Sequence, residues 1–168
     1  MLMFNESTGT DENTNAEIRD GFWKALAAGP TVMLALDAST HAAEPMRAQL
    51  DRDAHGAIWF FTSRDNRCAA GGAAHAQFVA KGQDQFASIS GRLVEERDAA
   101  VIDRFWSNPI AAWYPQGRTD ANLLVLRFEL DSAEIWQPEL GLTGGFKMLT
   151  GMTLKPSEVG KHAVVGLG

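Results

Sequence analysis

The sequence of 168 residues has very little cysteine and no long apolar run. Its single cysteine, Cys68, cannot form an internal disulfide, and CxxC metal motifs are absent, so a reducing cytoplasm is the expected location. No apolar stretch approaches the length of a membrane span, and the first residues lack the basic flank and apolar core of a signal peptide. We therefore expect a chain that does not enter a membrane.

Basic residues are in the minority. The chain has 15 Lys and Arg against 21 Asp and Glu, which gives a formal net charge of -6 at pH 7. Contacts with the phosphates of nucleic acid or with anionic lipid need an excess of positive charge. We expect neither nucleic acid nor a membrane as a partner, and an anionic ligand has to be held by a local cluster of donors.

Several kinds of metal and catalytic site are also missing. The four histidines are scattered, with none of the HxH or HxxxH spacings of a metal site. There is no GxSxG nucleophile motif, no P-loop and no pair of carboxylates suited to acid–base catalysis. The sequence therefore predicts no metal site and assigns no catalytic residue.

What the chain does contain is one amphipathic helix followed by many short apolar runs. Ile18, Phe22 and Leu26 recur at helical spacing, which predicts a helix from about residues 13–15 to a stop at Gly29 and Pro30. Seven runs of strand length follow. They are residues 31–36, 45–50, 57–62, 75–80, 86–95, 123–130 and 132–137.

The other helical segments are short. We expect one helix in the segment that follows residues 63–68, one capped by Asp98, one helical turn over residues 110–114 and one helix over residues 146–152. Because strands dominate, the predicted fold is mainly β, an antiparallel β-barrel with peripheral helices packed outside it.

The polarity of the chain divides it into three parts. We expect residues 1–15 to form a flexible N-terminal segment and residues 16–138 to form the barrel domain. Residues 139–168 are rich in glycine at their start, and we expect them to form a tail that packs on the barrel or on a partner subunit.

The end of the third predicted strand is the strongest candidate site. The strand ends in Thr62 and Ser63 and continues into a segment that carries Arg64 and Arg67. Free N–H groups at the start of a helix, with a charge-assisted bond from Arg67, can hold a phosphate. The alternative is a solvated turn in which Arg64 pairs with Asp65, and spacing alone favours that commoner outcome.

Aromatic residues supply a second group of candidates. Trp136, near the end of the last predicted strand, can cover a flat ring or fill the core, and core filling is the commoner role. Trp106, Trp113 and Tyr114 carry the same two alternatives. Cys68 follows an arginine, so it is either a thiol of lowered pKa or a small residue of a helix.

Five segments, taken in their order and spacing, are more specific for a family than any one of them is alone. They are residues 44–47, 58–67, 88–92, 112–117 and 134–137. Together they resemble the FMN-binding split barrels of the pyridoxamine 5'-phosphate oxidase-like superfamily, and most of all its general stress protein 26 group. The resemblance runs from about Phe22 to Gln137.

The resemblance implies a fold, a partner and a cofactor. The fold is an antiparallel, Greek-key-type split barrel that forms a homodimer with FMN at the subunit interface. The backbone of Met46, Arg47 and Ala48 is expected to run beside the flavin. Thr62 and Ser63 are expected to meet the isoalloxazine or ribityl part of FMN.

The same resemblance assigns residues to the phosphate of FMN and to the far side of its isoalloxazine ring. Arg67 is expected to bind the phosphate, with Arg64 in support. Trp136 is expected to approach the ring from the other subunit, and Trp113 is expected to lie nearby. Where the family often has a second basic residue, this chain has Cys68, so one phosphate cation is missing.

The activity that the resemblance implies is an FMN-dependent oxidoreductase that uses NAD(P)H or a small-molecule substrate. Residues 138–143 contain neither the Arg nor the His with which true pyridoxamine phosphate oxidases contact their substrate, so oxidation of pyridoxamine phosphate is not expected. Two alternatives stay open: a non-catalytic flavin-binding stress protein, and a split barrel that binds deazaflavin F420 or haem.

Overall fold

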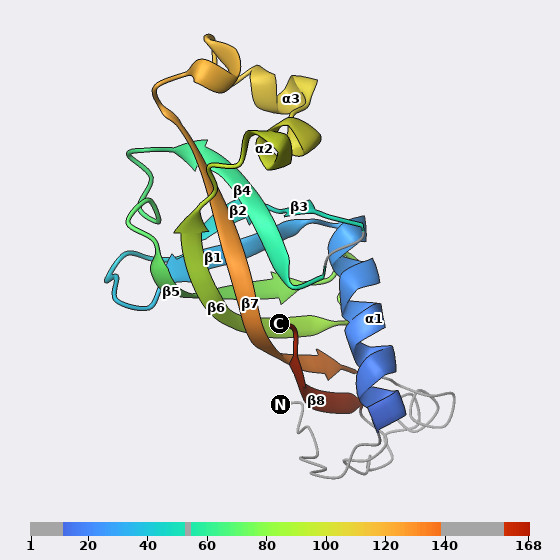
Figure 1. Ribbon diagram of the computed structural model, residues 1–168. Coiled ribbons are helices and arrows are strands. Elements are labelled where there is room, and N and C mark those ends of the chain that lie inside the picture. Colours follow the sequence, from blue (N-terminus) through green and yellow to red (C-terminus); the bar gives the residue numbers. More distant parts are fainter. Residues whose placement is uncertain (1–11, 53–54, 139–159) are drawn as a thin grey trace.

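The structure is a computed structural model that describes residues 12–52, 55–138 and 160–168. Figure 1 shows a curved antiparallel sheet closed most of the way into a barrel, with one long helix along its side and short helices at one end. The mainly β, antiparallel barrel predicted from the sequence is confirmed. Among the helices of the described residues, none is long and apolar enough to cross a membrane.

Helix α1 (Glu12–Ala28) packs on the barrel through the face that its periodicity predicts. Ile18, Phe22 and Leu26 are buried on that face. The helix ends just before Gly29, as expected. It begins early enough that its first turn falls inside residues 1–15, which we had expected to be flexible.

Eight strands form the sheet, in the order β2-β1-β5-β6-β7-β4-β3, with β8 paired to β7. All of the pairings are antiparallel. The strands are β1 Thr31–Leu36, β2 Glu44–Arg47, β3 Gln49–Leu50, β4 Ala57–Ser63, β5 Gly72–Val79, β6 Phe86–Glu95, β7 Leu123–Gln137 and β8 Lys161–Gly166.

Strands β2 and β3 bring the two ends of the sheet together. The sequence predicts one extended segment here, whereas the chain pairs first with β1 and then, after Ala48, with β4. At the changeover the Ala48 amide donates to the Pro30 carbonyl over 2.8 Å. One short segment thereby spans both ends of the strand order.

Strand β7 is a single strand of 15 residues where the sequence predicts two. The register with β6 shifts between Ser90 and Gly91, and Asp131 is the extra residue on β7. A bulge of this kind bends a strand without ending it. The polar residues that were read as a break are therefore a bulge.

The helix expected after residues 63–68 is absent, and that prediction is wrong. Residues 64–71 form consecutive turns, in which the amides of Asn66, Ala69 and Gly71 each donate to the carbonyl three residues back. Gly71 and Gly72 have φ of 65° and 104°, a region that favours glycine, and they lead the chain into β5. Repeated turns, rather than a helix, therefore follow β4.

The short helices lie at one end of the barrel (Figure 1). They are α2 (Ala99–Phe105), α3 (Asn108–Ala111) and the 3-10 helix η1 (Gly117–Thr119). As predicted, Asp98 caps α2, and its side chain accepts from the Ala100 amide over 2.9 Å. Strand β8 was not predicted from the sequence, and the helix expected over residues 146–152 lies outside the described residues.

Two apolar clusters hold the molecule together. The larger fills the barrel beneath α1 and includes Phe60, Phe78 and Phe128, all fully buried. The smaller lies between strands β4 and β7 and helices α2 and α3, around Trp59 and Tyr114. This second cluster fixes the short helices beside the end of β4, and so it positions the candidate site.

The bulge beside Gly91 gives a prediction about stability. A Cβ at this position would lie 2.2 Å from the Glu129 carbonyl oxygen and 2.8 Å from the ring of Phe128. We expect Gly91→Ala to lower the free energy of unfolding by about 1–3 kcal/mol, because the backbone has to move. Urea denaturation checks this. Gly29→Ala, where the nearest atom is 3.7 Å away, is the control, and equal stability of the two variants would contradict the prediction.

Candidate functional site

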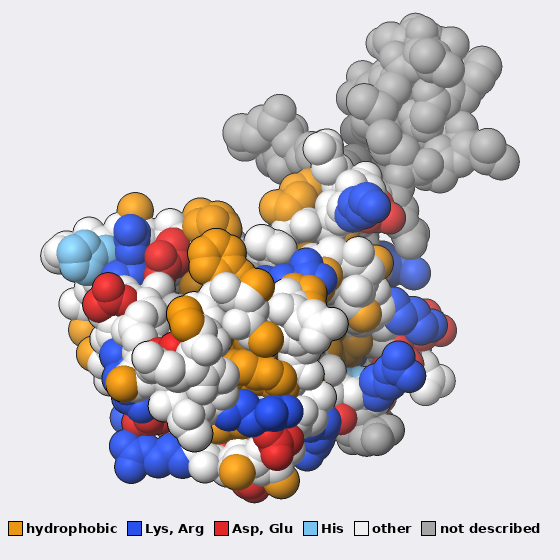
Figure 2. Space-filling model, turned by 90° about the horizontal axis from the view of Figure 1, so that it is seen from above, with side chains coloured by type: hydrophobic (Ala, Val, Ile, Leu, Met, Phe, Trp, Pro, Cys, Tyr) orange, Lys and Arg blue, Asp and Glu red, His pale blue; other side chains and the backbone are white. Residues whose placement is uncertain are grey.

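A large cavity lies where β4 ends, between that strand and α3. Its volume is about 850 Å³. Figure 2 looks onto this end of the molecule and shows hydrophobic and basic side chains together at the surface. The cavity is lined by Arg47, Gln49, Phe61, Thr62, Ser63, Asp65, Ser107, Pro109, Ile110, Trp113, Tyr114 and Asn122.

The end of β4 is held in place by Tyr114. Its hydroxyl donates to the Thr62 carbonyl over 2.8 Å. Burial, with the nearby charge of Asp120, raises the pKa of this phenol, so it stays protonated as a donor. The Ser63 hydroxyl donates to the Asp65 carboxylate at the start of the turn. Thr62 and Ser63 are therefore presented at the cavity from a fixed backbone.

Phe61 and Tyr114 line the cavity, and both contact Trp106 in edge-on or tilted geometry. The ring centroids of Trp106 lie 6.0 Å from those of Phe61 and Tyr114, while Trp59 and Phe105 lie 5.0 Å apart. Aromatic pairs at such distances stabilise the packing beyond the area they bury. The aromatic part of the wall is accordingly a packed apolar surface beside the polar residues of the lining.

Trp113 is the exception among these rings. Its side chain is 82% exposed on the rim of the cavity, although the neighbouring Tyr114 is buried. A large indole left in water at the edge of a cavity is a surface suited to a ligand or a partner. Trp113 thus lines the same cavity as Thr62 and Ser63, and its predicted place near a flavin ring stays a prediction.

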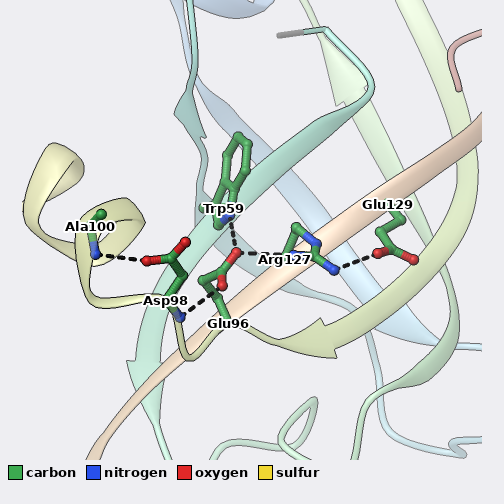
Figure 3. A network of polar contacts seen from close by, with 6 residues as sticks. All are labelled: Trp59, Glu96, Asp98, Ala100, Arg127 and Glu129. Carbon is green, nitrogen blue, oxygen red and sulfur yellow. Dashed lines mark hydrogen bonds and ion pairs between the residues drawn. The ribbon is translucent and has the colours of Figure 1, made fainter.

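A buried carboxylate ties the helical wall to the barrel (Figure 3). Glu96 is 7% exposed and accepts from the Trp59 indole over 3.1 Å and from Arg127 over 3.2 Å. It also accepts from the Asp98 amide over 3.0 Å, at the start of α2. Burial alone would raise the pKa of Glu96, but these donors and the Arg127 charge together lower it. Glu96 is therefore ionised at neutral pH.

The three arginines of the predicted site lie at different places; Arg67 and Arg64 were predicted for the phosphate, and Arg47 was predicted beside the flavin through its backbone. Arg47 lines the cavity. Arg67 lies in the turn after β4, where it pairs with Glu44 over 3.4 Å and donates to the Ala42 carbonyl over 2.8 Å. Arg64 pairs with Glu95 over 3.0 Å and lines a separate hollow. The proposed alternative, an Arg64–Asp65 pair, is not formed.

The three consecutive residues expected beside the flavin alternate in direction. The side chains of Met46 and Ala48 are buried in the barrel core, whereas Arg47 between them is exposed. This alternation is the rule for a strand. It leaves the Arg47 side chain facing the cavity.

Cys68 is buried and lies in the turn rather than in a helix. Burial, with the charge of Glu44, raises the pKa of its thiol despite the neighbouring Arg67. Both alternatives given for Cys68, the small helix residue and the thiol of lowered pKa, are therefore wrong.

Trp136 lies far from the cavity of its own chain. It is one residue from the end of β7, whereas Asn122, which lines the cavity, directly precedes the start of that strand. Trp136 is 14 residue steps from Asn122, which correspond to about 45 Å along the strand at about 3.3 Å per step. Within one chain, Trp136 and the other predicted residues are not brought together.

The sequence analysis missed several residues of the cavity. Gln49, Asp65 and Asn122 supply polar groups, and Phe61 supplies apolar surface. The sequence predicted that a strand ends at residues 60–63. The alternation of side-chain direction along that strand could have indicated that Phe61 faces the cavity. Nothing in the local sequence marks Asn122, which reaches the cavity only because β7 pairs with β4.

The sequence of the whole chain was compared with families of known proteins. Residues 17–160 match the family described as pyridoxamine 5'-phosphate oxidase like. No match was found among curated proteins. Because the matched segment includes most of the chain, it contains both the cavity and β7.

Solved structures agree with this match. A general stress FMN/FAD binding protein from Xanthomonas citri is 47% identical over 76% of this chain and 93% of that one, with a TM-score of 0.68. A general stress family protein from Xanthomonas campestris pv. campestris is 46% identical over 76% and 92%, with a TM-score of 0.66. A general stress protein 26 from Jannaschia sp. CCS1 is 28% identical over 90% and 98%, with a TM-score of 0.74. The chain therefore belongs to the pyridoxamine 5'-phosphate oxidase-like family.

Proposed function

We propose that this chain binds FMN in the cavity beside β4 and acts as an FMN-dependent oxidoreductase. The observation that carries the proposal is the cavity itself. It combines a cation, two hydroxyl side chains at a strand end and an aromatic wall in about 850 Å³. A similar protein is described as FMN/FAD binding.

The chemistry of the lining fits the parts of a flavin. Arg47 lines the cavity, and Arg67 lies two residues beyond Asp65, which also lines it. We propose that both bind the phosphate, Arg67 by exchanging its pairing with Glu44 for the phosphate oxygens. Thr62 and Ser63 suit the polar ribityl chain. Phe61 and Trp113 suit the flat faces of the ring system.

We further propose that two copies of the chain pair through the outer face of the sheet. One row across β1, β5, β6, β7 and β8 consists of Met33, Gln77, Ser88, Glu134 and Val164. Met33 and Val164 are exposed hydrophobic residues, and Glu134 is the one acidic or basic residue of this row. A broad, charge-poor sheet face of this kind is suited to burial against a second copy.

The same face carries Trp136. The next row contains Val79, Phe86, Trp136 and His162. Trp136 is remote from the cavity of its own chain. A contact between Trp136 and a flavin is therefore proposed to come from a second copy that packs on this face. The proposed site is therefore shared, with the cavity from one copy and Trp136 from the other.

When bound, FMN supplies the electron transfer itself. The chain binds the cofactor, orients it with the rigid end of β4 and limits water at the ring through its aromatic wall. Because the flavin is itself the hydride acceptor, the proposed reaction needs no acid or base from the chain. The proposed reaction oxidises NAD(P)H or a small reduced molecule.

The absorption spectrum of the purified protein and a titration with FMN test the binding. We expect flavin bands and binding of one FMN per chain. In stopped-flow experiments, NADPH or NADH should reduce the bound flavin faster than free FMN. Flavin binding without faster reduction would contradict the oxidoreductase and favour a non-catalytic flavin protein. Haem or F420 bands in place of flavin would contradict FMN as the cofactor.

A further inference from the structure

Strand β8 places an imidazole ring against the indole of Trp136. The two residues are direct partners in the β7–β8 pairing. The ring centroids of Trp136 and His162 lie 5.4 Å apart, and the ring planes differ by 20°, so the rings are stacked. Figure 1 shows β8 lying beside the end of β7.

A carboxylate fixes the imidazole in that position. Nε2 of His162 lies 2.9 Å from Oε1 of Glu134, which is two residues before Trp136 on the same face of β7. The His162 side chain is only 12% exposed, although it lies on the outer face of the sheet. The ring is therefore held by a stack on one side and a hydrogen bond to Glu134 at its edge.

The contacts that anchor β8 to the barrel come from other residues. Ala163 and Val165 are buried in the core, on the opposite face of the strand from His162. Removing the imidazole leaves these contacts and the β7–β8 ladder intact. The stack on Trp136 is thus separable from the folding of the barrel.

We infer that His162, held by Glu134, is a positioning residue that fixes the Trp136 indole for contact with the flavin of the partner subunit. This inference rests on the proposed shared FMN site. An indole supported on one face has fewer orientations to lose when a flat ring packs on it, so the support raises affinity. A strand without any recognisable motif thereby contributes to the site.

Four variants test this inference. We expect His162→Ala to raise the Kd for FMN about 3- to 10-fold, the range set by the loss of one stacked aromatic pair. It should also alter the near-ultraviolet circular dichroism of tryptophan and the fluorescence quenching of bound flavin. His162→Phe keeps a flat ring and should restore both signals and most of the affinity. Glu134→Ala should shift all three readouts in the same direction by a smaller factor. His55→Ala removes an imidazole stacked on another indole, that of Trp23, away from the proposed site. It is the matched control and should leave the Kd for FMN unchanged.

The outcomes separate this inference from the proposed function. Wild type that binds FMN, with a His162→Ala variant that has the same affinity and the same spectra, would overturn the positioning role alone. Wild type that binds no FMN would overturn the shared site and this inference together. Should His162→Ala fail to fold, Glu134→Ala, changed at a half-exposed side chain, decides the question by the same three readouts.

Discussion

Replacing Arg67 with alanine is expected to raise the Kd for FMN roughly 10- to 100-fold, the effect of losing one hydrogen bond to a charged group. The guanidinium lies in the turn after β4, two residues beyond Asp65, which lines the cavity. Its present partner, Glu44, is also bound by Asn66 over 2.6 Å. The variant would leave that carboxylate without its cation, and its charge would then repel the phosphate.

Titration of the apoprotein with FMN measures this effect. Arg97→Ala is the matched control, because it removes an equal charge from an arginine that pairs with Glu95 outside the cavity. The Arg67–Glu44 pair is partly exposed, so the Arg67 variant should lose at most about 1 kcal/mol of stability. An unchanged Kd in Arg67→Ala would remove Arg67 from the site and leave Arg47 as the phosphate cation.

Replacing Glu96 with alanine is expected to lower the free energy of unfolding by about 2–4 kcal/mol. The change deprives the Trp59 indole and the Asp98 amide of their acceptor, and it removes one of the two carboxylates that pair with Arg127. Glu129→Ala, which removes the other and more exposed carboxylate, is the control and should cost less than about 1 kcal/mol. Similar losses in the two variants would contradict the importance of the buried network.

The effect of Glu96 should depend on pH. Because its pKa is lower in the folded protein than its ordinary value of 4.5, its ionised form stabilises the fold above that value. This contribution is lost as the pH falls through the folded pKa. Denaturation at several pH values should therefore show a gap between wild type and Glu96→Ala that is widest near neutrality and narrows in acid. A gap that stays constant into strong acid would contradict this.

The sequence was sufficient for the elements whose patterns are local. The spacing of Ile18, Phe22 and Leu26 predicted α1, and the alternation along residues 86–95 predicted β6. Asp98 was correctly read as a helix cap. In each of these cases one segment contains both the pattern and its physical cause.

The errors arose where pairing at a distance decides the structure. Asp131 was read as a break because its accommodation in a bulge depends on β6. The turns after β4 were read as a helix, although Gly71 and Gly72 divert the chain into β5. Strand β8 was missed because its role depends on β7. For the same reason Asn122 and the Glu96 network could not be assigned to the site in advance.

Sedimentation of the FMN-loaded protein, followed by flavin absorbance, tests the shared site most directly. We predict that flavin sediments with a species of twice the mass of one chain, at one FMN per chain, and that Trp136→Ala weakens this binding. A monomer that binds FMN with the same affinity, or a Trp136→Ala variant indistinguishable from wild type, would contradict it.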